Sequence, residues 1–215
     1  KIIQIAAIND RNENFNEYVN PHVPIPSQST DIHGISYNDI KNNDSFENVS
    51  KQFMSFILKN VNEDDTVILI AHNNYHFDML MLLKEFDSVN IDFFQKHKNI
   101  KFFCSLKMFR LNHVNIKSKS LFKNPYSLVN LYKYFYPKET LFKAHDALAD
   151  VLALKRICES FLDITIENCI HATDVCSINI ETPVTSIRYI GPWRERKMKK
   201  LLTNMKHKNI VEDVP

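Results

Sequence analysis

The segment Thr66–Asp78, with the sequence TVILIAHNNYHFD, decides the fold. Its first part, Thr66–Ala71, is an uninterrupted apolar and β-branched run between polar residues, which is typical of a buried central strand. Helical spacing of apolar residues resumes over residues 75–86. A buried strand followed directly by a helix predicts an α/β protein. In such folds a carboxylate just beyond the strand, here Asp78, is well placed to meet a ligand.

The sequence on both sides extends this α/β pattern. Ile2–Ile8 (IIQIAAI) and the alternating Phe15–Val19 predict two paired strands. Residues 45–60 place their apolar side chains on one face and predict an amphipathic helix. Three further elements are expected, namely a strand at Lys101–Cys104 and helices over 126–135 and 145–162. The sequence therefore predicts a mixed central sheet flanked by helices.

Length and composition are those of one globular domain with a small appendage. The chain has 215 residues, of which 44% are hydrophobic and 24% charged. No apolar run approaches the ~20 residues of a membrane-spanning helix, so no membrane partner is expected. The four cysteines lack CxxC spacing and indicate reduced thiols in an intracellular compartment, either cytoplasm or nucleus. Zinc binding is the alternative for the loose cluster formed by Cys169, His171 and Cys176.

The charge is unevenly distributed along the chain. Residues 188–208 hold eight lysines and arginines and one glutamate, so a net charge of +2 leaves the remainder acidic. This pattern fits an enzyme that gathers carboxylates around cations and binds a polyanion through its tail, although solvated surface charge is an alternative. We expect a globular domain over 1–165, a linker over 166–183 and a basic helical tail over 184–215.

The tail resembles a helix-hairpin-helix element, which presents backbone N–H groups to phosphate. Gly191, Arg194 and Lys197 are its candidate phosphate-binding residues. Only one of the usual glycines of that element is present. A basic surface helix that packs on the globular domain is therefore the alternative interpretation.

Three short segments contain the residue types that chemistry requires. The first holds Asn73 and Asp78, and the second holds His145 and Asp150, five positions apart at the start of a predicted helix. Five positions do not share one helix face, so the histidine is expected on the entering loop. The third segment is His33-Gly34-Ile35, whose glycine permits close backbone approach to a sugar or phosphate. Each segment also has a structural interpretation: a helix-start acid favoured by the helix dipole, a chance histidine–aspartate pair, and a turn before a helix.

Taken together, five segments in this order resemble one enzyme family. They are IIQIAAI (2–8), YVNPHVPI (18–25), HGIS (33–36), AHNNYHFD (71–78) and HDALADVLAL (145–154). They are similar to segments of the DEDDh 3′–5′ exonucleases, which have a ribonuclease-H-like fold and include proofreading subunits and three-prime repair exonucleases. The likeness covers about residues 1–162. It implies hydrolysis of phosphodiester bonds at the 3′ ends of single-stranded or frayed DNA or RNA, releasing nucleoside 5′-monophosphates.

The resemblance also implies a role for each candidate residue. Two divalent cations, Mg²⁺ or Mn²⁺, would be bound with Asp150 as a ligand and Asp78 in support. His145 would be the general base, because imidazole is the side chain that titrates near neutrality. The terminal nucleotide would be held by Asn73 and by the His33-Gly34-Ile35 turn.

The first motif of this family, an Asp-x-Glu on an opening strand, is expected upstream of Ile2–Ile8. A strand and a turn need on the order of 10–20 residues, and Lys1 leaves no room for them. Asp10 and Glu13 follow the first predicted strand and are not substitutes for this motif. We therefore expect the chain as given to bind metal poorly. A nucleic-acid-binding pseudo-exonuclease is the rival hypothesis.

Overall fold

The computed structural model describes residues 1–62, 65–97, 99–112, 116, 124–161 and 173–174. The basic tail with Gly191, Arg194 and Lys197 lies outside these residues, as does the candidate zinc cluster. Of the predicted linker, the described part is Thr173–Asp174, which forms the short strand β5. Across the described residues, none of the helices is both long and apolar enough to cross a membrane.

The first two strands form a hairpin, as the alternation of their residues predicts. β1 (Gln4–Ile8) pairs antiparallel with β2 (Asn14–Tyr18), in a register that runs from Gln4 opposite Tyr18 to Ile8 opposite Asn14. Within the connecting turn, the Asn9 side chain accepts hydrogen bonds from the backbone N–H groups of Arg11 and Glu13. This local bonding by an asparagine side chain closes the turn.

A second sheet lies at the centre of the molecule. β3 (Val67–Ala71) pairs in parallel with β4 (Ile100–Cys104), and β4 pairs antiparallel with β5. The expected mixed sheet is therefore confirmed. Among the described residues, however, β1 and β2 form a sheet of their own rather than joining the β3-β4-β5 sheet. Strand patterns specify which faces are buried, but they do not specify which strand edges meet.

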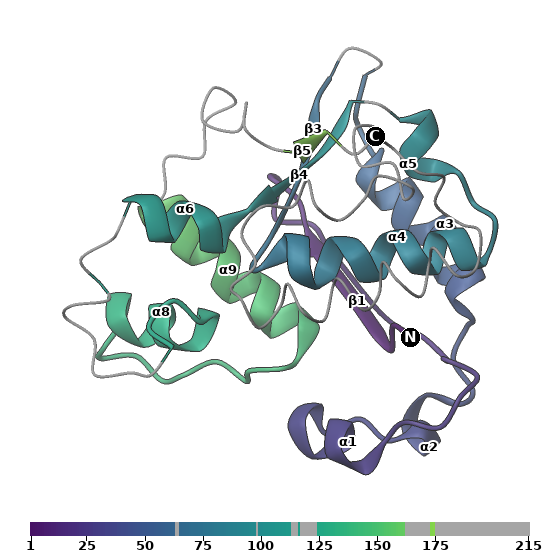
Figure 1. Ribbon diagram of the computed structural model, residues 1–215, viewed down its shortest axis with the longest axis horizontal. Coiled ribbons are helices and arrows are strands. Elements are labelled where there is room, and N and C mark those ends of the chain that lie inside the picture. The colour runs from purple at the N-terminus through teal and green to yellow at the C-terminus, as the bar shows by residue number, and fades with distance from the viewer. Residues whose placement is uncertain (63–64, 98, 113–115, 117–123, 162–172, 175–215) are drawn as a thin grey trace, which may run out of the picture.

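Helices surround both sheets (Figure 1). Their bounds are α1 Ser27–His33, α2 Tyr37–Ile40, α3 Phe46–Ile57, α4 Asp78–Ser88, α5 Phe93–Lys96, α6 Ser105–Asn112, α8 Leu128–Phe135 and α9 Ala147–Phe161, with a 3₁₀ turn η1 at Asn74–His76. The expected helix over 75–86 is thus divided between η1 and α4, because Asn74–His76 closes a tighter turn before the helix begins.

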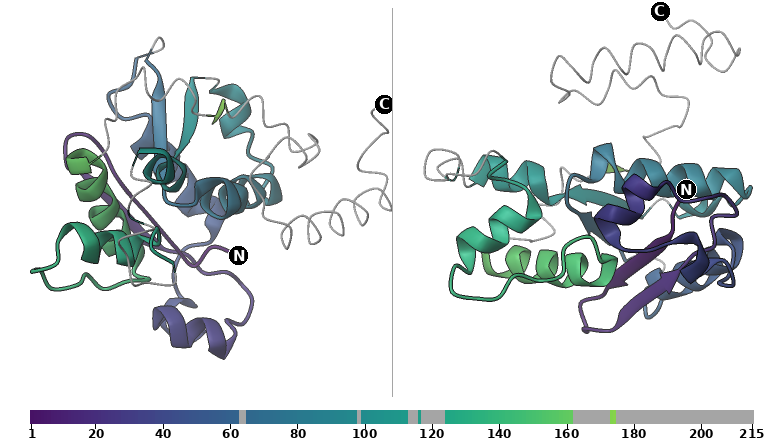
Figure 2. Two further views of the ribbon diagram at one scale, coloured as in Figure 1. Left: turned by 60° about the vertical axis from the view of Figure 1, so that its left-hand side comes forward. Right: turned by 90° about the horizontal axis from the view of Figure 1, so that it is seen from below.

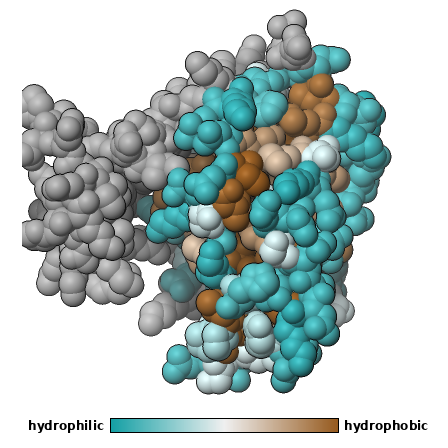
Figure 3. Space-filling model, turned by 90° about the vertical axis from the view of Figure 1, so that its right-hand side faces the viewer, coloured by the Kyte–Doolittle hydropathy of each residue, from teal (hydrophilic) through white to brown (hydrophobic). Residues whose placement is uncertain are grey.

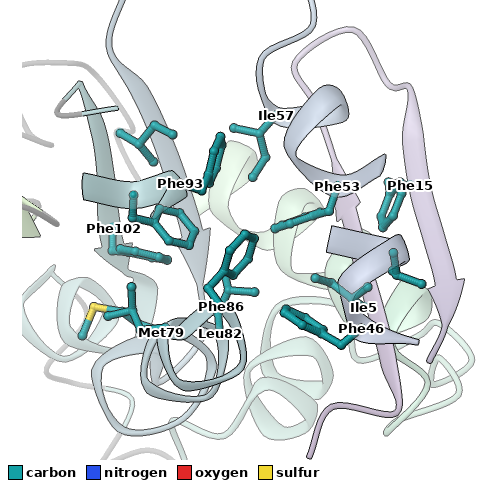
Figure 4. Close-up of a cluster of buried hydrophobic side chains, with 14 of the residues drawn as sticks. Ile5, Phe15, Phe46, Phe53, Ile57, Met79, Leu82, Phe86, Phe93 and Phe102 are labelled. Carbon is teal, nitrogen blue, oxygen red and sulfur yellow. The ribbon is translucent and has the colours of Figure 1, made fainter. Parts of the chain in front are cut away.

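The largest apolar cluster fills the space between the β1–β2 hairpin, α3, α4, α5 and β4 (Figure 4). Phenylalanine rings from different elements touch in it, among them Phe15 with Phe53 at 5.5 Å and Phe46 with Phe86 at 5.4 Å between ring centroids. A second cluster, built around Phe109, joins α6, α8 and α9. Burial of this much aromatic surface is the main favourable term that holds the layers together.

Two features of the arrangement bear on the site. Helix α9 lies against β1, as both Figure 1 and Figure 2 show. Helices α1 and α2 project away from the layers (bottom of Figure 1), and α1 has no buried residue. The face formed by the right-hand side of Figure 1 is mostly hydrophilic, with smaller apolar areas between the polar side chains (Figure 3).

Candidate active site

The loop that follows β3 is held in place by two asparagines. Asn73 adopts a left-handed backbone conformation with φ 64°, which asparagine tolerates better than most residues. Asn74 is fully buried, where its Nδ2 donates to the Phe103 carbonyl at 3.3 Å and its Oδ1 accepts from the Met79 N–H at 3.1 Å. These bonds tie the start of α4 to β4 and so fix the position of Asp78, the first residue of α4.

His72 joins three segments behind this loop. Its Nε2 lies 2.8 Å from the carbonyl oxygen of Tyr126 and its Nδ1 lies 3.0 Å from the Ser105 hydroxyl. Because a carbonyl only accepts, Nε2 carries the proton. In the neutral ring Nδ1 is then an acceptor for the Ser105 hydroxyl, which also lies 3.3 Å from the carbonyl oxygen of Ala71. Burial is the main reason why the pKa of His72 falls to about 4, so the ring is neutral at physiological pH. His72 therefore has a structural role, although it lies next to the candidate residues in the sequence.

Asp78 lies in the first turn of α4 and Asp150 lies in the first turn of α9. The pKa of Asp78 is raised to about 6, mainly by burial and also by the negative charge of Asp150. The Asp78 side chain nevertheless keeps access to solvent on one side. Burial also raises the pKa of Asp150, against the opposing effect of a hydrogen bond from His145. The charge of Asp150 is a smaller cause of the raised pKa of Asp78 than burial, and it indicates that the two carboxylates lie near enough for their charges to interact.

His145 lies on the loop that enters α9, in agreement with the five-residue spacing. It is exposed and has a left-handed backbone with φ 69°. Its N–H donates to Oδ1 of Asp150 at 3.3 Å. One residue later, the Asp146 side chain accepts from the N–H of Ala149 at 3.1 Å and caps the helix. Backbone geometry thus places the imidazole and the Asp150 carboxylate at the same helix end.

Phe77 is a feature of the site that the sequence analysis missed. The residue lies directly before Asp78, its surface is 64% exposed, and its backbone (φ −137°, ψ −79°) is unusual. Nearby, Oδ1 of Asn73 is buried and has no hydrogen-bond partner among the described residues. An exposed aromatic ring and an unpaired hydrogen-bond acceptor beside a carboxylate can together bind a ligand that is both aromatic and polar. The available signal was an aromatic residue next to an acid just beyond a buried strand.

The His33-Gly34-Ile35 segment forms the end of α1. Gly34 has φ 78° and its N–H donates to the Thr30 carbonyl, which is the usual way a glycine ends a helix. The Ile35 N–H donates to Nδ1 of His33 at 3.1 Å. A shallow cavity of about 220 Å³ is lined by Tyr18, Gly34, Ile35, Asp39 and Ile40. The segment therefore borders a cavity, and the glycine is required by its positive φ.

The available ligands suit a hard cation that is shared with a substrate. Within the described part of the chain, no group of three or more His, Cys, Asp or Glu side chains is placed to hold a metal ion. Asp78 and Asp150 nevertheless supply two carboxylates whose pKa values are raised, in both cases mainly by burial. Mg²⁺ is usually bound by one or two carboxylates together with water and substrate phosphate oxygens. The residues present therefore fit such an ion.

The fold and the site define a class of protein. A family model described as Exonuclease matches residues 1–158, which is more than half of the chain. The chain therefore belongs to the Exonuclease family (RNase_T), and it has the ribonuclease-H-like exonuclease fold. The expected resemblance to 3′–5′ exonucleases is confirmed at the level of the family.

Individual relatives are similar at low identity. The DNA polymerase III subunit epsilon of Rickettsia typhi is 29% identical over 163 residues, which are 73% of this chain and 64% of that protein. The 3′–5′ exonuclease DinG of Bacillus subtilis is 35% identical over 83 residues, 37% of this chain and 8% of DinG. The chain thus spans less than two thirds of these relatives. The crystal structure of cell-death related nuclease 4 matches 76% of this chain and 57% of its own, with a TM-score of 0.57 and 20% identity.

Proposed function

We propose that the chain is a 3′–5′ exonuclease domain that hydrolyses phosphodiester bonds at nucleic-acid 3′ ends and releases nucleoside 5′-monophosphates with the help of two Mg²⁺ or Mn²⁺ ions. The observation that carries this proposal is that the negative charge of Asp150 adds to burial in raising the pKa of Asp78. Asp78 begins α4, and Asp150 lies in the first turn of α9. The names of the relatives, which include an exonuclease, support the same reaction.

Each candidate residue has its own role in the proposed reaction. Asp78 and Asp150 would hold the cations, which supply charge stabilisation at the attacking and leaving oxygens when bound. His145 is exposed and its backbone N–H is bonded to Asp150, and its imidazole accepts a proton from the attacking water. Because the backbone N–H of His145 is bonded to Asp150, the position of the base is coupled to that of the metal ligand.

The terminal nucleotide is held by groups on the β3–α4 loop. The Phe77 ring is exposed beside Asp78 and can stack on a nucleobase. Base–aromatic stacking contributes about 1–3 kcal/mol per base and tolerates any sequence. The unpaired Oδ1 of Asn73 can accept a hydrogen bond from the same nucleotide. Such contacts need an unpaired base, so single-stranded or frayed DNA or RNA ends are the proposed substrates. The His33-Gly34-Ile35 turn is a further candidate contact.

Digestion of end-labelled oligonucleotides tests this function. Single-stranded DNA and RNA carrying a 5′ label would be incubated with the chain and Mg²⁺, and the products resolved by length and by nucleotide analysis. His145 and His22 both have positive φ angles, 69° and 53°. Asparagine tolerates this conformation, so His145→Asn and His22→Asn form a matched pair. We expect stepwise shortening with 5′-monophosphate release, a loss of about 100-fold or more in His145→Asn, and normal turnover in His22→Asn.

A pseudo-exonuclease that binds nucleic acid without hydrolysis is the second candidate. One observation favours it: the described residues include no cluster of three or more metal-binding side chains. Weak metal binding by this chain stays a prediction, and calorimetric titration with Mn²⁺ measures it. Tight binding of single strands without shortened products, at any Mg²⁺ or Mn²⁺ concentration, would favour the pseudo-exonuclease over the enzyme.

A further inference from the structure

A contact at the start of α9 has no role in the proposed chemistry so far. The backbone N–H of Ala147, the first residue of α9, donates to Oε1 of Gln4 on β1 at 3.2 Å. The same glutamine donates from Nε2 to Oδ1 of Asn16 on β2 at 3.0 Å. Gln4 therefore connects the N-terminal hairpin with a helix 143 positions later in the chain.

The hairpin register explains why Gln4 faces α9. Ala6 lies opposite Asn16 and Gln4 lies opposite Tyr18, so Gln4 and Asn16 are diagonal neighbours on one face of the hairpin. Side chains alternate between the two faces of a strand, so Ile5 points the other way, into the largest apolar cluster. Helix α9 lies against β1 (Figure 2) and meets the Gln4 face.

Gln4 links the start of α9 to another element of the fold, which the cap formed by Asp146 does not do. The first N–H groups of a helix lack partners within the helix. Asp146 pairs with one of them, the N–H of Ala149, but Asp146 is itself part of the same segment. Its bond caps the first turn of the helix, but it does not fix where the helix lies relative to the hairpin. The bond from Ala147 to Gln4 fixes the helix end relative to the hairpin.

We propose that Gln4 is a positioning residue for His145 and Asp150, acting through the N–H of Ala147. This inference rests on the proposed function, because it assigns Gln4 to the same site. Ala147 lies between His145 and Asp150 in the sequence, and the His145 N–H is bonded to Asp150. A shift of Ala147 therefore moves both groups together relative to Asp78. Misplacement by about 1 Å can lower a rate by about 100-fold.

Two substitutions of Gln4 separate positioning from general stability. Gln4→Met has a similar length but no acceptor, whereas Gln4→Glu keeps an acceptor for the Ala147 N–H. Amide hydrogen exchange of Ala147 would be compared with that of Ala149, whose N–H is capped by Asp146 in the same helix turn. In Gln4→Met we expect exchange at Ala147 to rise about tenfold relative to Ala149. We expect kcat to fall about 10- to 100-fold with little change in KM, and Gln4→Glu to restore both.

The outcomes distinguish this inference from the proposed function. Equal changes in exchange at Ala147 and Ala149 in Gln4→Met would show a general loss of stability and overturn the positioning role. So would unchanged turnover in Gln4→Met. If the unmodified chain has no nuclease activity, the proposed function fails. The positioning role can still be tested in that case, because NMR resonances of the His145 ring and the Asp150 carboxyl report the positions of these groups. Resonances that stay in place in Gln4→Met would overturn the inference in that case as well.

Discussion

Replacement of His72 by glutamine is expected to change how the stability of the protein depends on pH. The imidazole donates to the Tyr126 carbonyl and accepts from the Ser105 hydroxyl in a largely buried place. Burial is the main cause that lowers its pKa from 6.5 to about 4, and the charge of Arg110 lowers it further, while the bond to Tyr126 opposes them. The folded protein thus prefers the neutral ring more strongly than the unfolded chain does.

The size and sign of the effect follow from these two pKa values. A pKa that falls from 6.5 to about 4 on folding corresponds to about 3 kcal/mol. Because the folded pKa is the lower one, this stabilisation is complete above about pH 6.5. It is lost as the pH falls from there through about 4, where the folded protein must also accept the proton. His72→Gln has no such proton to accept.

Urea denaturation of the parent and of His72→Gln between about pH 8 and pH 4 measures this effect. The difference in the free energy of unfolding removes contributions that both proteins share, such as that of Asp78. We expect the advantage of the parent to shrink by about 3 kcal/mol across this range. Ser105→Ala is the control, because it removes the hydroxyl that contacts His72 and the Ala71 carbonyl, at about 1 kcal/mol per hydrogen bond, and keeps the titrating ring. A difference between parent and His72→Gln that does not vary with pH would falsify the reasoning.

Two further substitutions test the site and its support. Asp78→Asn removes a carboxylate whose pKa is raised to about 6 by burial and by Asp150, so its ionised form destabilises the folded state. Without divalent ions we expect this variant to be more stable than the parent above about pH 6, by about 1 kcal/mol after allowance for solvent screening. Below about pH 4 we expect no gain in stability. Turnover is expected to be lost. Asn74→Ala leaves the Phe103 carbonyl and the Met79 N–H without their partner, so thermal denaturation should show a loss of about 1–3 kcal/mol and turnover should fall with it.

Much of the secondary structure could be predicted from the sequence, because the signals are local. Alternation in Phe15–Val19 and the apolar run of Thr66–Ala71 gave strands within one or two residues of β2 and β3. The apolar face of residues 45–60 gave α3. The helix α1 was not predicted, because three prolines, Pro21, Pro24 and Pro26, precede it and disfavour regular structure. Pro26 in fact precedes the first turn of α1, where a missing N–H has no cost.

The candidate residues were identified from short motifs, but their geometry was not. The sequence named Asp78, His145 and Asp150, and it placed the histidine on the loop before the helix. It did not show that Asp78 and Asp150 lie close enough to interact, since that depends on the packing of α4 and α9. It also did not show that Phe77 is exposed, because an aromatic residue beside a helix is more often buried.

The amino-acid sequence by itself determined the strands, the amphipathic helices and the acids at the ends of elements. These depend on neighbours within a few positions, where periodicity and capping operate. The tertiary structure alone decided that the described strands form two sheets, that Gln4 meets Ala147, and that the charge of Asp150 reaches Asp78. Such pairings join groups far apart in the chain, and they are fixed only when the packing of whole elements determines which surfaces touch.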